Sequence, residues 1–205
     1  MTWTEGPPDG WRAFADVRQS IEEDLKSQPG WVATAMLADR RTGNGVSVGY
    51  WETEEALRAS EAGHQARMQR GQSTGSRVRE TERYEIVHQE RSAPPQENTF
   101  ARVNDLRGTP ARLDEMIKFV RERVAPVLKG QNGFRALLMG VNRETGRSFV
   151  GSIWDSAADR EASDAALTEL RRQGGQIAGA EQTKVELYEV VALMEKSKGA
   201  LAANR

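Results

Sequence analysis

The sequence predicts an α+β protein made of two β-α-β-β-α-β repeats. The main observation is an internal register: setting Gly30 on Gly133 without a gap brings Trp51 onto Trp154. The same register pairs "AS" at 59–60 with "AS" at 162–163. It slips by one residue before "ERYEIV" meets "ELYEVV". A register kept over so many positions indicates an internal duplication, which is assigned before any finer structure.

The second observation is the junction between the repeats. The stretch "HQERSAPPQENT" is polar, has no periodicity and contains two consecutive prolines, which favour an extended linker. We therefore expect the first repeat at residues 1–88, the linker at 89–99 and the second repeat at 100–195. Residues 196–205 are expected to form a frayed tail.

The second repeat shows the whole pattern. "TFARVNDL" predicts a strand, and "TPARLDEMIKFVRERVAPVL" predicts a helix with Thr109 as N-cap and Pro110 at its first position. Apolar residues recur at spacings of three and four along it, but Pro126 should kink or shorten the helix. "FRALLMGV" and "SFVGSIW" flank the turn "NRETG" and predict a hairpin. Ser156 then caps a second helix, with Asp159 placed as in a capping box, before the strand "TKVELYEVVALM".

The first repeat follows the same order. "WVATAMLA" and "GVSVGYW" flank the turn "DRRTGN", and Thr53 caps the next helix. Only "MTWTE" is left to match the opening strand of the second repeat, so the first strand should be short or missing. The "AS" pairs are interpreted as small residues that let a helix lie close to the sheet. The apolar stripe of the first helix consists of Trp11, Phe14, Val17, Ile21 and Leu25.

Composition excludes several classes of function. The 205 residues carry a net charge of −1 and no cysteine, which argues against nucleic-acid or membrane partners and removes disulfides and thiolate chemistry. No apolar run approaches the roughly 20 residues that span a bilayer, and no signal peptide is recognised. With two histidines and no "HExxH", no metal site is expected. A cytoplasmic protein is the expectation.

The turns "DRRTG" and "NRETG", followed by strands that run into "YWETEEALRAS" and "IWDSAADREAS", carry a family resemblance. The chain resembles the antibiotic-biosynthesis-monooxygenase-like domains of the dimeric α+β barrel superfamily, once per repeat. The resemblance implies two ferredoxin-like units that pair as an intrachain pseudo-dimeric α+β barrel. A reactive pocket is then expected between the sheet and the helices of a unit. A further homo-oligomer is left open.

The resemblance implies a cofactor-independent monooxygenase that acts on a small aromatic substrate of polyketide or quinol type. Such a substrate reduces oxygen itself once it is deprotonated, so the protein supplies orientation, a base and exclusion of water. The haem-degrading branch pairs an early-strand Asn with a late-helix His and a Trp. In this chain Ala101 stands near the position of that Asn, and the second helix of neither repeat contains a Trp, so haem cleavage is not expected. The alternative is a non-catalytic ligand-binding or accessory protein of the same fold.

His64 and Tyr84 are the candidate catalytic residues. A histidine titrates in a useful range, and a phenol can hold a substrate oxygen. The structural alternatives are a partly exposed helix residue for His64 and a mid-strand core edge for Tyr84 and its counterpart Tyr188.

Candidate substrate-binding residues are aromatic rings that could stack on a planar ligand, together with one amide. Core packing is the alternative for the rings, and solvent exposure is the alternative for the strand residues Arg102 and Asn104. Because His64 faces Leu167 across the repeats, any pocket is expected in the first repeat. The full set is Trp11, Trp31, Trp51, Asn104, Trp154 and Tyr188.

Overall fold

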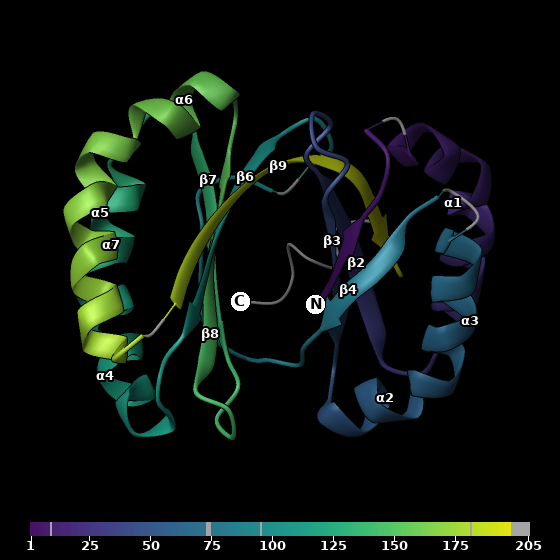
Figure 1. The fold of residues 1–205 in the computed structure, drawn as a ribbon, viewed down its shortest axis with the longest axis horizontal. Coiled ribbons are helices and arrows are strands. Elements are labelled where there is room, and N and C mark those ends of the chain that lie inside the picture. Colours follow the sequence, from purple (N-terminus) through teal and green to yellow (C-terminus); the bar gives the residue numbers. More distant parts are fainter. Residues whose placement is uncertain (9, 73–74, 95, 181, 198–205) are drawn as a thin grey trace. The chain divides into compact units, whose positions relative to one another are not determined.

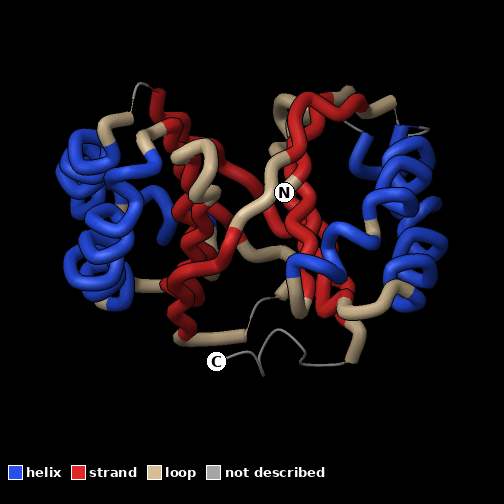
Figure 2. The backbone as a smooth tube through the Cα atoms, turned by 90° about the horizontal axis from the view of Figure 1, so that it is seen from below, coloured by secondary structure: helices blue, strands red, loops and turns tan. Residues whose placement is uncertain are grey.

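The computed structural model describes residues 1–8, 10–72, 75–94, 96–180 and 182–197, without the side chains of residues 11, 13, 15, 71, 182 and 183. Contacts divide the chain into two compact units, which we call unit 1 and unit 2. Unit 1 contains Met1–Glu82, Gln96–Asn98 and the residues from Glu189 onward, and unit 2 contains Arg83–Pro95 and Thr99–Tyr188. In each unit the helices lie on one face of the strands (Figures 1 and 2).

Unit 1 is an antiparallel arrangement in the order β4-β1-β3-β2-β9. Helices α1 and α3 cover its strands (Figure 1). The predicted hairpin is confirmed, with Trp31 opposite Trp51 and Ala38 opposite Gly45. Its elements are β1 (Thr2–Glu5), α1 (Gly10–Ser27), β2 (Trp31–Ala38), β3 (Gly45–Trp51), α2 (Glu54–Ala59), α3 (Glu61–Gln72) and β4 (Arg77–Thr81).

Unit 2 has the strand order β9-β6-β8-β7-β5, with α4, α5 and α7 over the sheet (Figure 1). Its elements are β5 (Glu85–Arg91), β6 (Phe100–Arg107), η1 (Pro110–Arg112), α4 (Leu113–Phe119), η2 (Val120–Val124), α5 (Ala125–Lys129), β7 (Phe134–Val141), β8 (Arg147–Trp154), α6 (Ala157–Ala162), α7 (Asp164–Ala178) and β9 (Gln182–Glu195).

The compact units do not coincide with the two sequence repeats, because the last strand of each repeat pairs with strands of the other. β5 pairs with β7, so residues 85–91 belong to unit 2 and part of the expected linker is strand. The later part of β9 pairs with β2, with Ala38 opposite Glu189 and Ala33 opposite Glu195. The whole of β5 therefore belongs to unit 2, whereas β9 is divided, with the residues before Glu189 in unit 2 and those from Glu189 in unit 1.

The short first strand is confirmed. β1 has four residues, whereas β6, its counterpart in unit 2, has eight. β1 nevertheless pairs with both β3 and β4. The last strand of the first repeat is interrupted between β4 and β5, so Tyr84 lies at a break and not in mid-strand as expected. Tyr188 does lie within β9.

The long helix of unit 2 changes its winding just before Pro126. Val120–Val124 forms a π-helical turn, in which the amide of Ala125 donates to the carbonyl oxygen of Val120. Proline lacks an amide donor and its ring crowds the preceding turn, so regular α-helical bonding is disfavoured here. The kink predicted from Pro126 therefore appears as a widened turn, and both ends of that turn face the site described below.

The repeated "AS" pairs, interpreted as small residues that let a helix lie close to the sheet, mark breaks between helices. Ser60 separates α2 from α3, and Ser163 separates α6 from α7. Both serines are buried, while the preceding alanines are exposed. Two of the three predicted caps are confirmed: Thr53 Oγ1 accepts from the Ala56 amide at 3.2 Å, and Ser156 Oγ accepts from the Asp159 amide at 3.0 Å. Thr109 lies at the predicted N-cap position before Pro110, but its side chain makes no capping hydrogen bond.

One buried ion pair holds β6 to β8. Arg147 donates from Nε and Nη2 to the two carboxylate oxygens of Asp105 at 2.9 and 2.8 Å, and both side chains are buried. Such two-pronged geometry is the strong form of an arginine–carboxylate contact. The pair therefore fixes the register of the two strands that form the floor of the site.

Candidate functional site

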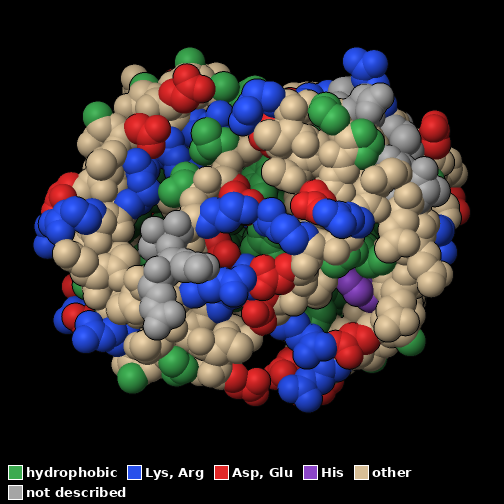
Figure 3. Space-filling view, viewed as in Figure 1, with side chains coloured by type: hydrophobic (Ala, Val, Ile, Leu, Met, Phe, Trp, Pro, Cys, Tyr) green, Lys and Arg blue, Asp and Glu red, His purple; other side chains and the backbone are tan. Residues whose placement is uncertain are grey.

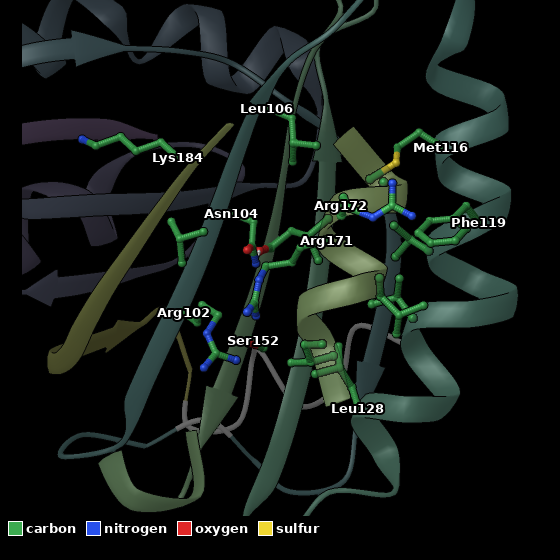
Figure 4. Close-up of a pocket in the computed structure, with 17 residues that line it drawn as sticks. Arg102, Asn104, Leu106, Met116, Phe119, Leu128, Ser152, Arg171, Arg172 and Lys184 are labelled. Atoms are coloured by element: carbon green, nitrogen blue, oxygen red, sulfur yellow. Dashed lines mark hydrogen bonds between the residues drawn. The ribbon is translucent and has the colours of Figure 1, made fainter. Parts of the chain in front are cut away.

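Unit 2 contains a cavity of about 250 Å³ between its sheet and its helices. Most of its wall is apolar: Leu106 and Val150 face it from the strands, and Met116, Phe119 and Leu128 from the helix side (Figure 4). Val120 and Val124, the first and last residues of the π turn, also line it. Ligand pockets usually measure about 300–1,000 Å³ and have mostly apolar walls, so this cavity suits a small ligand.

One end of the cavity is polar and cationic. Figure 4 shows Arg102, Asn104, Ser152 and Arg171 gathered at this end, away from Met116 and Phe119. Arg102 and Asn104 come from β6, Ser152 from β8 and Arg171 from α7. Among the described residues that line the cavity there is no carboxylate, histidine or tyrosine. The site can bind and orient an electron-rich or anionic group, but these lining residues supply no general base.

Arg102 is the deepest of these cations, with 1% of its surface exposed. It donates from Nη1 to Ser163 Oγ at 2.9 Å and from Nη2 to the Arg160 carbonyl oxygen at 2.5 Å. It also pairs with Asp164 at 3.0 Å. Burial lowers the pKa of Arg102; Asp164 opposes that shift, while neighbouring Arg171 and Arg160 add to it. Arg102 is thus a cation held in place by the helix break at Ser163.

Asn104 is half-buried beside Arg102 on the same face of β6. Its Nδ2 donates to the Val150 carbonyl oxygen at 3.1 Å, which fixes the amide orientation. Its Oδ1 is buried and accepts no hydrogen bond from the described residues. A buried acceptor without a donor is costly unless something else satisfies it. Asn104 thus presents an open acceptor to the cavity.

Of the predicted site residues whose side chains the structure describes, Asn104 alone lines this cavity. Trp31 and Trp154 are fully buried, and their ring nitrogens donate within the core to Thr34 and Ser152, both at 3.0 Å. Tyr188 is 3% exposed within β9, and Trp51 is half-buried at the end of β3. The side chain of Trp11 lies outside the described part of the structure.

The two candidate catalytic residues also lie elsewhere. His64 is half-buried on α3 in unit 1, where burial, then Arg67 and then the chain's amino terminus lower its pKa. Tyr84 packs edge-on against Phe149 in unit 2, with ring centroids 4.9 Å apart. Neither lines this cavity, and their catalytic roles stay predictions.

The cavity lies in the second repeat, whereas the aromatic richness of the first repeat had favoured that half. The physical reason is that those rings fill space. Trp31 packs with Ile21, Leu25 and Met194 in a closed cluster, and Trp51 lies against it. Sequence reasoning set Arg102 aside as a solvent-facing strand residue and missed Arg171. Both faces of β6 are buried, so no alternation in the sequence marks its polar residues as inward.

Sequence comparison relates the chain to two known proteins. No family model matches the chain. Two uncharacterized proteins of Mycobacterium tuberculosis, Rv2557 and Rv2558, are 26% identical over 168 residues and 28% identical over 178 residues. The matches cover 80% and 86% of this chain and 75% of each relative.

Solved structures define the fold. An anthrone oxidase-like protein matches 96% of this chain and 94% of its own, with a TM-score of 0.69 and 15% identity. A ferredoxin-fold protein of Listeria monocytogenes, related to antibiotic biosynthesis monooxygenases, matches 94% and 95%, with a TM-score of 0.54 and 8% identity. The chain has an antibiotic-biosynthesis-monooxygenase-like fold. A heme-degrading enzyme of the same species matches with a TM-score of 0.52, so this fold is shared across different chemistries.

Within this monooxygenase-like fold, further chemistry is limited by what the described residues offer. No helix among them is long and apolar enough to cross a membrane. In the same described ranges no group of three or more His, Asp or Glu residues is placed to hold a metal ion. On the face shown in Figure 3, charges of both signs are interspersed.

Proposed function

We propose that the chain is a monooxygenase that oxidises a small aromatic substrate of anthrone or quinol type in the unit 2 cavity. The observation that carries the proposal is an apolar cavity of about 250 Å³ with a cationic polar end, in a chain whose fold matches an anthrone oxidase-like protein. The apolar walls hold and desolvate the rings, and the polar end orients the ring oxygen.

The proposed reaction uses the substrate's own electrons. In an anthrone, a ring CH₂ flanked by the aromatic system loses its two hydrogens and becomes a carbonyl; in a quinol, a ring C–H becomes C–OH and the ring is oxidised to the quinone. In both cases O₂ accepts four electrons. One oxygen atom enters the product and the other leaves as water, so atoms and electrons balance without a bound cofactor. Arg102 and Arg171 stabilise the negative charge that develops on the ring oxygen before oxygen attacks.

The second candidate function is ligand binding without turnover. The observation in its favour is that the described lining residues contain no general base. Oxygen uptake separates the two candidates. With anthrone or a naphthoquinol as substrate, we expect uptake that depends on protein concentration and falls when the cavity is filled by Gly174→Leu. Saturable binding of the same compounds with uptake at the buffer rate would refute the enzyme and support the binding protein.

The finer architecture is part of the proposal. The hairpin β2–β3 and the hairpin β7–β8 share their register and the position of their irregularity, which supports a tandem duplication. The intrachain pseudo-dimeric barrel stays a prediction, and small-angle X-ray scattering of the monomer tests it. The cytoplasmic location, the lack of nucleic-acid and membrane partners, and a homo-oligomer are likewise untested.

A further inference from the structure

The cationic end of the cavity contains more positive charge than its carboxylates balance. Arg102 and Arg171 both pair with Asp164, at 3.0 and 2.9 Å, so two guanidinium groups share one carboxylate. That carboxylate is about half exposed, whereas Arg102 is almost fully buried. A buried cation whose partner is partly lost to solvent remains under-compensated and attracts another anion.

The other two cations that line the cavity are already balanced. Arg172 donates from Nε and Nη2 to the two carboxylate oxygens of Glu169, at 2.8 and 2.6 Å. Lys184 donates to Glu186. The unbalanced charge is therefore confined to Arg102 and Arg171, which lie at the same end of the cavity (Figure 4).

Three buried polar atoms at this end have no hydrogen-bond partner among the described residues. Two are donors, Arg102 Nε and Arg171 Nη1, and one is an acceptor, Asn104 Oδ1. Other polar atoms of these side chains already have partners: Arg102 Nη1 and Nη2 donate to Ser163 and to the Arg160 carbonyl oxygen, and Asn104 Nδ2 donates to the Val150 carbonyl oxygen. The open set is thus two charged donors and one neutral acceptor.

We propose that the cavity selects an aromatic ligand that is already ionised to an oxyanion. Arg102 Nε and Arg171 Nη1 donate hydrogen bonds to the oxyanion, and a separate donor group of the ligand binds Asn104 Oδ1. The oxyanion is a carboxylate or the enolate of an acidic enol. This deepens the proposed function: a substrate that arrives as the enolate needs no general base in the lining, and a carboxylate would be bound and oriented by the same two donors. It rests on that function only for the aromatic nature of the ligand.

Isothermal titration calorimetry on the full chain at pH 7.5 tests the anion subsite with matched probes. 2-Naphthoate is compared with neutral 2-naphthamide, and the acidic enol 2-hydroxy-1,4-naphthoquinone with 1,4-naphthoquinone. We expect at least one anion to bind about tenfold or more tightly than its neutral partner, the size expected of charge-assisted hydrogen bonds. The pair that shows the preference identifies the source of the oxyanion. Equal or tighter binding of both neutral probes, or no binding by any probe, overturns the proposal.

Arg171→Met and Arg172→Met form a matched pair on neighbouring positions of α7. Arg171→Met should abolish the preference for the anion without weakening the neutral probe more than about threefold, and Arg171→Lys should restore part of it. Arg172→Met should change anion affinity less than about threefold, because Glu169 already neutralises that guanidinium. Equal losses in the two Met variants would show a general surface attraction and overturn the assignment.

Asn104 is tested separately. The 3-, 6- and 7-hydroxy-2-naphthoates are compared with 2-naphthoate, and at least one isomer should gain about fivefold or more in affinity, a gain that Asn104→Leu removes. If no isomer gains, the donor part of the proposal is wrong. Should Arg171→Met fail to fold, Asn104→Asp replaces it: a fixed carboxylate beside the two donors should cost anion affinity about tenfold or more. Loss of oxygen uptake with intact anion binding refutes the proposed enzyme but not this subsite.

Discussion

Removing Asp105 should destabilise unit 2 more than any exposed ion pair would. Asp105→Leu leaves the Arg147 guanidinium buried without the carboxylate that now accepts two hydrogen bonds at 2.9 and 2.8 Å. Breaking a buried pair on one side costs about 3–5 kcal/mol. Arg147 has further interactions, so the lower end, about 3 kcal/mol, is expected. With a urea slope of about 1–3 kcal/mol/M, the unfolding midpoint should fall by about 1–3 M.

A double-mutant cycle separates the pair from its surroundings. Arg147→Met should cost a similar amount, but Asp105→Leu/Arg147→Met should cost far less than the sum, because it leaves no lone buried charge. Urea unfolding followed by circular dichroism gives all four free energies. If the double variant lost the full sum, the two side chains would not be coupled and the stated role of the pair would be refuted. Binding of 2-naphthoate should weaken with the single variants, since the pair aligns the strands that carry Asn104 and Ser152.

The remaining predictions concern the cavity, pH and a helix cap. Gly174→Leu should reduce 2-naphthoate affinity about tenfold or more, because the new side chain enters the cavity wall beside Met116 and Phe119, whose nearest atoms lie 3.2 and 3.5 Å from the added Cβ; unchanged affinity would place the ligand elsewhere. Burial lowers the pKa of His64 from 6.5, so the unfolded chain binds the proton more readily and stability should fall as pH drops below about 6.5. His64→Gln should flatten part of that fall in urea midpoints between pH 7.5 and 5.5, and an identical slope would contradict it. Ser156→Ala should cost about 1 kcal/mol in the same unfolding assay, whereas Ser156→Thr, whose hydroxyl can also donate to Asp159, should retain most of the cap.

Local signals in the sequence were sufficient for most elements. The hairpin strands at 31–38, 45–51 and 134–141 begin and end where their apolar runs and turns predict. The turn glycines explain why: Gly43 and Gly146 have φ of +78° and +76°, a conformation that other residues rarely adopt. The caps at Thr53 and Ser156 could also be predicted from the sequence, because each is a contact between residues three positions apart.

The site was harder because its chemistry depends on contacts between distant segments. Arg102 acquires its role from a serine and an aspartate some sixty positions later, which no local pattern connects. The pairing of β5 with β7 and of the later part of β9 with β2 was likewise not predicted, since strand pairing between distant segments leaves no local pattern. The tryptophans were predicted to bind a substrate for a related reason: the sequence does not distinguish a ring that packs in a core from one that stacks on a ligand.

The π turn before Pro126 also changes the angular phase of its helix. Its hydrogen bond spans five residues in place of four, so successive side chains within it advance by a smaller angle than in an α-helix. Val120, Val124 and Leu128 lie four residues apart. Residues four apart shift steadily around the axis of a regular α-helix, but across a widened turn they stay in line. All three face the cavity. A helical wheel drawn at constant pitch therefore misplaces the residues beyond Val120.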